Sequence, residues 1–252
     1  MQKIPKTMHK PSLLYILPNL FTASSIFIGV ISIVEASKGH FIQASWLILL
    51  ALVFDGLDGR VARMTNTTSQ FGVEFDSLAD IISFGIAPAM LLFFFVGYEF
   101  GRFGILVSAL YVIFGAIRLA RFNISTGKTD PNVFIGLPIP AAAIFISMWI
   151  LLFNKYDLAP YSVILLCLAF AVAVLMVSNF RYPSFKKVKL DKPMVFKTMI
   201  LLVLAASLLY LFSAEGFALI ILAYVAYGPL RALRTINSRR FGHAKRQEDI
   251  EP

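Results

Sequence analysis

Long apolar runs separated by short polar segments dominate the chain, and this pattern limits what it can fold into. Of the 252 residues, 58% are hydrophobic and 15% are charged, unlike the composition of a soluble domain. A helix needs about 20 mostly apolar residues to cross a bilayer. We count eight such runs, at residues 13–35, 41–60, 76–97, 103–122, 137–153, 160–180, 196–213 and 216–234. The sequence therefore predicts an all-α integral membrane protein, a bundle of about eight transmembrane helices.

Polar segments mark the two ends of the chain. Residues 1–12 are basic and are predicted to form an interfacial N-terminal segment. The run that follows is long enough to span a membrane and lacks a small-residue cleavage pattern, so we expect it to remain as an anchor. Residues 181–234 hold a basic loop and the last two runs, and residues 235–252 are expected to form a solvated, disordered cytoplasmic tail.

Basic residues are divided unevenly between the two sides that alternating spans would create. Of the 23 lysines and arginines, only Lys38, Arg102 and Lys155 fall on one side. Positively charged loops remain in the cytoplasm, so we expect both termini and residues 55–80 on the cytoplasmic side of the cell (inner) membrane. The net charge of +9 then reflects topology and contact with anionic membrane lipids, and no nucleic-acid partner is expected.

Four aspartates lie where the second and third runs meet. Asp55 and Asp58 are three residues apart, and Asp76 and Asp80 are four apart, so each pair projects from one face of a helix. Carboxylates at a membrane edge are costly and indicate function. Two converging pairs would form a four-carboxylate cluster, and oxygen ligands of this kind suit hard divalent cations.

Small and cationic residues surround these aspartates. Gly59, Ala62 and Gly72 leave room for a polar ligand close to the backbone, and Arg63 can bind a phosphate through two hydrogen bonds. Ser69 extends the face that carries the second aspartate pair. These features suit a pyrophosphate bound through metal, with one carboxylate acting as general base towards a hydroxyl. A lipid substrate would explain why such a site lies at the membrane edge.

The segment from Asp55 to Asp80 resembles the signature D-x2-D-G-x2-A-R-x8-G-x3-D-x3-D of the CDP-alcohol phosphatidyltransferase family. All eight fixed positions match: Asp55, Asp58, Gly59, Ala62, Arg63, Gly72, Asp76 and Asp80. The resemblance implies a catalytic core within residues 13–180 that has six helices, and a homodimer. It also implies two divalent ions, Mg²⁺ or Mn²⁺, and transfer of a substituted phosphate from a CDP-linked donor to an alcohol with release of CMP.

The same resemblance assigns roles to individual residues. Asp55, Asp58 and Asp76 would hold metal, and Asp80 would accept the proton and also touch metal. The CDP-lipid would contact residues of the signature and of the first run: Asn19, Thr22, Gly59, Ala62, Arg63, Ser69 and Gly72. For the two residues of the first run, the alternative is that they satisfy backbone groups freed by Pro18.

Three further strings, RLARFN at 118–123, GLPIPAAA at 136–143 and RYPSFK at 181–186, resemble the phosphatidylserine synthase branch of this family. That branch implies transfer of phosphatidyl from CDP-diacylglycerol to L-serine. Arg118 and Arg121 could face the serine carboxylate, or could instead be cationic anchors that reach the lipid headgroups. Asn123 could orient a ligand, or could form an ordinary helix-end hydrogen bond.

Two other functions are consistent with parts of the sequence. The same chemistry could use another acceptor, such as glycerol 3-phosphate or an inositol phosphate. A cation transporter could instead use the carboxylates as an ion path, but that function predicts acidic residues at mid-depth in several spans. Here they gather at one membrane edge.

Overall fold

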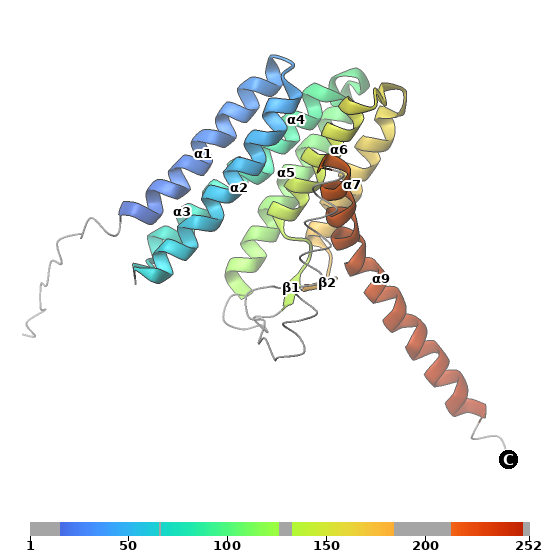
Figure 1. The fold of residues 1–252 in the computed structure, drawn as a ribbon. Helices are drawn as coiled ribbons and strands as arrows, with labels where there is room; N and C mark the ends of the chain where they lie inside the picture. Colours follow the sequence, from blue (N-terminus) through green and yellow to red (C-terminus); the bar gives the residue numbers. More distant parts are fainter. Residues whose placement is uncertain (1–15, 66, 126–132, 184–212, 249–252) are drawn as a thin grey trace, which may run out of the picture.

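The computed structural model describes residues 16–65, 67–125, 133–183 and 213–248, in which the chain forms a helical bundle (Figure 1). Short polar turns connect neighbouring antiparallel helices, and a two-stranded antiparallel ribbon lies at one end of the bundle. In chain order, the elements are α1 (Ile16–Ser37), α2 (Phe41–Met64), α3 (Gln70–Asp80), the π-helix η2 (Ile81–Ile86), α4 (Ala87–Phe95), the 3₁₀ turn η3 (Gly97–Phe100), α5 (Arg102–Ser125), β1 (Val133–Ile135), α6 (Ile139–Lys155), the 3₁₀ turn η4 (Ala159–Tyr161), α7 (Ser162–Val177), β2 (Arg181–Pro183) and α9 (Ser213–Glu248).

The helices confirm the prediction of an all-α membrane protein. Within the described ranges, five helical segments are long and apolar enough to span a bilayer, and α6 and α7 are shorter apolar helices. Seven of the eight predicted runs therefore coincide with helices. The run 196–213 lies outside the described residues except for its last position, so the count of eight is not confirmed.

Large apolar side chains cover the outside of the bundle as well as its core. Phe84, Leu91 and Ile146 are fully buried, whereas Phe27 is 68% exposed and Ile105 is 56% exposed. In water, many outward-facing side chains of this size would favour aggregation. Facing lipid, they need no covering, which agrees with a membrane-embedded bundle.

The third span begins earlier than predicted. The expected start was residue 76, but α3 begins at Gln70, because Ser69 caps it by accepting a hydrogen bond from the Gly72 N–H at 3.0 Å. A side-chain cap of this kind satisfies a free donor of the first turn. Asp76 and Asp80 consequently lie inside a formed helix.

Prolines define the start of α6. Pro138 is the N-cap residue and Pro140 lies in the first turn, where a missing N–H costs nothing because that turn has no intrahelical partner for it. These two residues therefore end the preceding ribbon and begin the helix without kinking a span.

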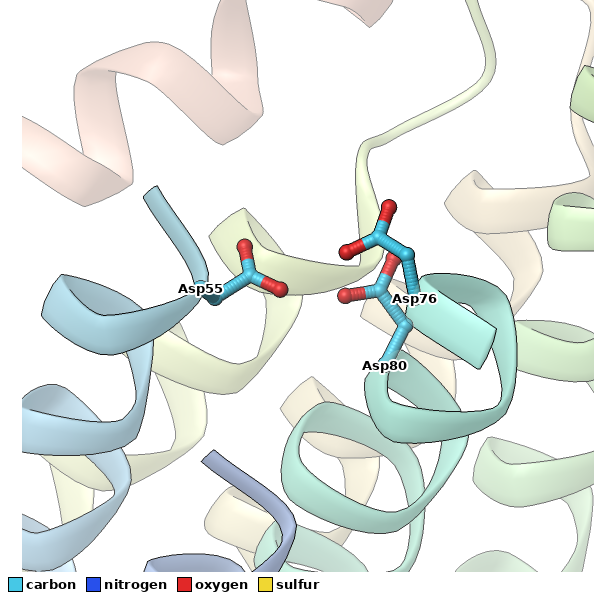
Figure 2. A group of neighbouring side chains, drawn as sticks. All are labelled: Asp55, Asp76 and Asp80. Carbon is cyan, nitrogen blue, oxygen red and sulfur yellow. The ribbon is translucent and has the colours of Figure 1, made fainter. Parts of the chain in front are cut away.

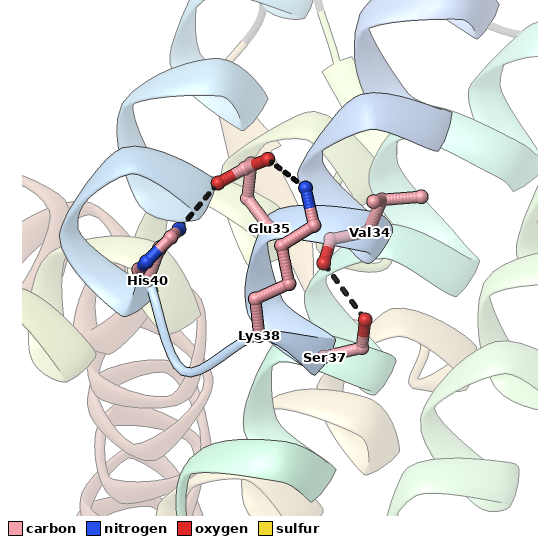
Figure 3. Close-up of polar contacts among 5 residues, drawn as sticks. All are labelled: Val34, Glu35, Ser37, Lys38 and His40. Atoms are coloured by element: carbon pink, nitrogen blue, oxygen red, sulfur yellow. Dashed lines mark hydrogen bonds and ion pairs between the residues drawn. The ribbon is translucent and has the colours of Figure 1, made fainter.

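The turn between α1 and α2 lies at the end of the bundle opposite the ribbon. Glu35 accepts hydrogen bonds from Lys38 at 2.9 Å and pairs with His40 at 2.6 Å (Figure 3). Gly39 adopts a left-handed backbone conformation with φ of 83°, which glycine allows without steric cost. The turn is thus closed by its own polar groups.

The C-terminal helix differs from its prediction. The span was expected to end at residue 234 and to be followed by a disordered tail, but α9 remains helical to Glu248 and its last part projects from the bundle (Figure 1). Extending a helix that already exists costs far less than nucleating one. At its start, Glu215 accepts hydrogen bonds from Lys155 and, at 2.6 Å, from Tyr156, which fixes α9 against the end of α6.

We predict that Gly104→Ala destabilises the bundle. A Cβ at Gly104 would lie 2.0 Å from the carbonyl oxygen of Gly97, so the backbone would have to move. The cost of such overpacking is about 1–3 kcal/mol. Thermal unfolding in detergent should show a lower midpoint. Gly56→Ala is the matched control, because no atom lies within 4 Å of its added Cβ. Equal midpoints for both variants would contradict the packing described here.

Candidate active site

Three carboxylates converge from two helices at the end of the bundle that carries the ribbon. Asp55 projects from α2, and Asp76 and Asp80 project from α3 across a narrow gap (Figure 2). One oxygen from each residue lies within 4.8 Å of the other two. The four-residue spacing on α3 places its two aspartates one turn apart on one face. We call these three residues the aspartate trio.

The trio fits a divalent cation. The Oδ1 atom of Asp55 is buried and has no hydrogen-bond partner among the described residues. Two like unit charges about 4 Å apart repel by about 4 kcal/mol when the effective dielectric constant is near 20. A hard cation such as Mg²⁺ or Mn²⁺ would relieve this repulsion and use the unpaired oxygen. Carboxylate oxygens are the ligands that these hard metal ions prefer, whereas soft metal ions prefer thiolates.

Asp58 lies beside the trio. Its carboxylate interacts with that of Asp76 and, electrostatically, with those of Asp55 and Asp80, so the four aspartates of the predicted cluster are neighbours. The hydroxyl of Thr22 in α1 donates to the Oδ2 of Asp58 at 2.7 Å and orients this carboxylate. The same hydroxyl also lies 3.2 Å from the carbonyl oxygen of Pro18, and contact between Thr22 and the CDP-lipid stays a prediction. Asp58 is only 6% exposed and faces the neighbouring cavity.

This cavity, of about 190 Å³, lies between α1, α2 and the start of α3. Hydroxyl, amide, guanidinium and carboxylate groups all contribute to its lining. All seven residues predicted to contact the CDP-lipid line it, together with two aspartates: Asn19, Thr22, Gly59, Ala62, Arg63, Ser69, Gly72, Asp58 and Asp76. Pro18, Thr67, Thr68 and Val73 also line it, and the sequence pattern gave no sign of the last three.

Glycine at position 72 keeps this cavity open. A Cβ there would lie 3.2 Å from the Ser69 hydroxyl and 3.6 Å from the side-chain oxygen of Asn19. A side chain at this position would therefore fill the space between α1 and α3. At Gly59, by contrast, an added Cβ would meet only the tip of Arg63, at 3.4 Å.

A π-helical turn directly follows Asp80 and sets the direction of the span below the trio. The turn η2 packs against α1, where Ser83 donates to the carbonyl of Ser25 at 3.0 Å. On the other side, Tyr111 of α5 donates to the carbonyl of Phe84 at 3.3 Å. Single π-helical turns often occur at functional sites. Here the turn is held by side chains of two neighbouring helices, which fixes the helix end that carries Asp80.

The three predicted acceptor residues have different surroundings. Arg121 donates to the carbonyl of Val177 at 2.5 Å and to Asn179 at 2.9 Å, so it caps the end of α7. Asn123 donates to the hydroxyl of Ser77 at 2.9 Å and connects α5 to α3. Both residues therefore connect neighbouring elements of the bundle, and their contact with the acceptor stays a prediction.

Arg118 is different because it is buried without a full set of partners. It is 6% exposed, and its Nε has no hydrogen-bond partner among the described residues. Its guanidinium carbon lies 5.1 Å from the ring centre of Phe122 and 5.9 Å from that of Phe134, and it interacts electrostatically with Asp80. Arg118 is therefore a buried cation beside the trio with a free donor. The aromatic packing around it was not predicted from the sequence.

Comparison with known proteins gives one family. The family described as CDP-alcohol phosphatidyltransferase matches residues 15–177. The chain is 55% identical to the CDP-diacylglycerol–serine O-phosphatidyltransferase of Helicobacter pylori (strain ATCC 700392 / 26695), over 87% of this chain and 92% of that protein. It is 34% identical to the protein of the same name from Methanocaldococcus jannaschii, over 83% and 94%. It is 41% identical to the archaetidylserine synthase of Methanothermobacter thermautotrophicus, over 66% and 69%.

We predict that Asp55→Asn weakens divalent-metal binding without unfolding the protein. Changes in the residues that merely support a metal ligand lower affinity about 10- to 100-fold, so loss of a charged ligand should lower Mn²⁺ affinity at least tenfold. Electron paramagnetic resonance of free Mn²⁺ in a titration of the purified protein measures this directly. Asp157→Asn, in the turn between α6 and α7, is the matched control. An unchanged Mn²⁺ affinity in the Asp55 variant would show that the trio is not the metal site.

Proposed function

The chain belongs to the CDP-alcohol phosphatidyltransferase family, and we propose that it transfers the phosphatidyl group of CDP-diacylglycerol to the hydroxyl of L-serine, releasing CMP. The aspartate trio beside the polar cavity is the observation that carries the reaction class. The names of all three relatives specify serine. The archaetidylserine synthase of Methanothermobacter thermautotrophicus differs from the other two in the lipid group that its name specifies. Serine is therefore the feature they share.

The cavity between α1, α2 and α3 is the place for the cytidine diphosphate part of the donor. Arg63 provides a planar guanidinium that can pair with phosphate oxygens, and Ser69 also lines the cavity. Asp58, fixed by Thr22, lies between this cavity and the trio. The diacylglycerol chains would remain in the surrounding bilayer, where the apolar outer surface of the helices faces lipid.

Asp55, Asp58, Asp76 and Asp80 would hold the divalent metal. Mg²⁺ or Mn²⁺, as two ions, would neutralise charge on the diphosphate and stabilise the departing CMP. Asp80 is the last residue of α3 and interacts electrostatically with Arg118. It would accept the proton of the serine hydroxyl while the serine oxygen attacks the lipid-linked phosphorus and the bond to the CMP oxygen breaks.

Arg118 is the proposed contact for the serine carboxylate. A buried guanidinium with a free N–H suits a carboxylate, because charge-assisted hydrogen bonds to planar oxygen pairs are strong. Its position beside Asp80 would place the serine hydroxyl near the base. Arg121 and Asn123 would act indirectly, since both already bind neighbouring helices.

We also propose a cytoplasmic location for the site, in the cell (inner) membrane, with both termini on that side, and a homodimeric assembly as is common in the family. The positive residues support the orientation. Lys38, Arg102 and Lys155 lie at helix ends away from the trio, whereas Arg60, Arg63, Arg118, Arg121 and Arg181 lie at the end that carries it. Cytoplasmic serine and CDP-lipid would both reach such a site.

We predict that CMP release by the purified protein depends on serine. The assay combines CDP-diacylglycerol, Mn²⁺ or Mg²⁺, and one acceptor at a time: L-serine, glycerol 3-phosphate or an inositol phosphate. Serine alone should support rapid release, and phosphatidylserine should appear in equal amount. Release with a different acceptor and none with serine would reassign the substrate while keeping the family chemistry.

Arg118→Met should raise the KM for serine about tenfold or more, because a hydrogen bond to a charged group contributes about 1.5–3 kcal/mol. The KM for CDP-diacylglycerol should change little. Arg121→Met provides the contrast: it should lower the thermal unfolding midpoint through loss of the α7 cap, with the serine KM nearly unchanged. A higher KM for the lipid donor in the Arg118 variant would place this arginine at the nucleotide instead.

A further inference from the structure

The ribbon docks against α9 at one specific point. Tyr182 of β2 is fully buried, and its hydroxyl donates to the carbonyl of Val225 at 3.1 Å. A Cβ at Gly228 would lie 2.4 Å from Cζ of the Tyr182 ring. Only glycine at position 228 leaves room for the ring, so the tyrosine and the helix are matched in shape.

The Tyr182 hydroxyl pairs with a carbonyl that has no hydrogen-bond donor within α9. Pro229 lies inside α9 and has no N–H, so the carbonyl four residues earlier, that of Val225, receives no intrahelical hydrogen bond. In a membrane, an unpaired carbonyl is costly because no water replaces the missing donor. The Tyr182 hydroxyl supplies that donor. This contact is therefore specific in chemistry as well as in shape.

The ribbon in turn reaches Arg118. Tyr182 is paired directly with Phe134 of β1, and directly paired residues of antiparallel strands present their side chains to the same face. The Phe134 ring is the one whose centre lies 5.9 Å from the guanidinium carbon of Arg118. The Tyr224 ring of α9 is tilted by 41° against the Tyr182 ring, with 5.6 Å between the ring centres, and Tyr224 interacts electrostatically with Arg118. A continuous set of contacts thus leads from α9 to this arginine.

We propose that α9 completes the acceptor site, with Tyr182 as a positioning residue that holds Phe134 against Arg118 and so fixes the guanidinium for the serine carboxylate. This inference rests on the proposed function. The family match ends at residue 177, so both β2 and α9 lie outside the shared region. Arg118 and Phe134 lie within residues 15–177, so β2 and α9 support this part of the shared region from outside it.

The test is a comparison of kinetic constants for two substrates in the full-length protein. Tyr182→Phe removes the hydroxyl and keeps the ring, and Gly228→Ala displaces the ring. Each variant should raise the KM for serine about 3- to 10-fold, the effect of one neutral hydrogen bond, and leave the KM for CDP-diacylglycerol and the Mn²⁺ affinity unchanged. Tyr227→Phe, an exposed tyrosine of the same helix, is the control and should behave as the wild type.

A double-mutant cycle separates positioning from general stability. Phe134→Leu alone should also raise the serine KM, and adding it to Tyr182→Phe should raise it little further, because both act through Arg118. An unchanged serine KM in Tyr182→Phe, or an equal rise for both substrates, would overturn the inference while serine-dependent turnover by the wild type upholds the proposed function. Absence of that turnover in the wild type would overturn both.

Discussion

Mutual repulsion among three carboxylates at the edge of a membrane is the constraint on which the rest of this structure depends. Asp55, Asp76 and Asp80 approach within 4.8 Å of one another in surroundings that screen charge poorly. Such a group is stable only if a cation joins it or protons neutralise it. A polar cavity, which we propose holds a diphosphate, lies beside the trio. The same charges that oppose folding of the empty site are those that a metal-bound diphosphate requires.

The helices around the trio restrict how it can relax. Thr22 of α1 holds Asp58 at one side, and the cap at Ser69 fixes the start of α3. Below Asp80, the π-helical turn is bonded to α1 and to α5. Arg118 supplies a buried positive charge that interacts with Asp80 and does not line the polar cavity.

Much of this arrangement could be predicted from the sequence because it depends on local spacing. Intervals of three and four residues placed each aspartate pair on one helix face, and apolar runs located the spans. The contact that orients Asp58 could not be predicted, since its partner Thr22 lies 36 residues away. For the same reason, spacing alone did not distinguish Arg118 from Arg121. Their difference comes from partners on α7 and β1, which only the fold brings near.

The helical extent of α9 and its docking at Gly228 also depend on tertiary contacts. RYPSFK could be recognised as a string that resembles one branch of the family, but its physical role was not evident. In the structure, its tyrosine compensates for Pro229 in a distant helix. The role of a motif outside the aspartate signature is therefore visible only once the packing of the helices is known. The role of the signature itself can be inferred from the spacing of its residues.

Anomalous X-ray diffraction from crystals of the protein grown with Mn²⁺ and a CDP-lipid would locate the metal directly. We expect manganese peaks bounded by Asp55, Asp76 and Asp80, with the diphosphate of the lipid lying between the metal and Arg63. Manganese bound elsewhere, with the trio free of metal and the nucleotide outside the cavity of α1, α2 and α3, would contradict this expectation.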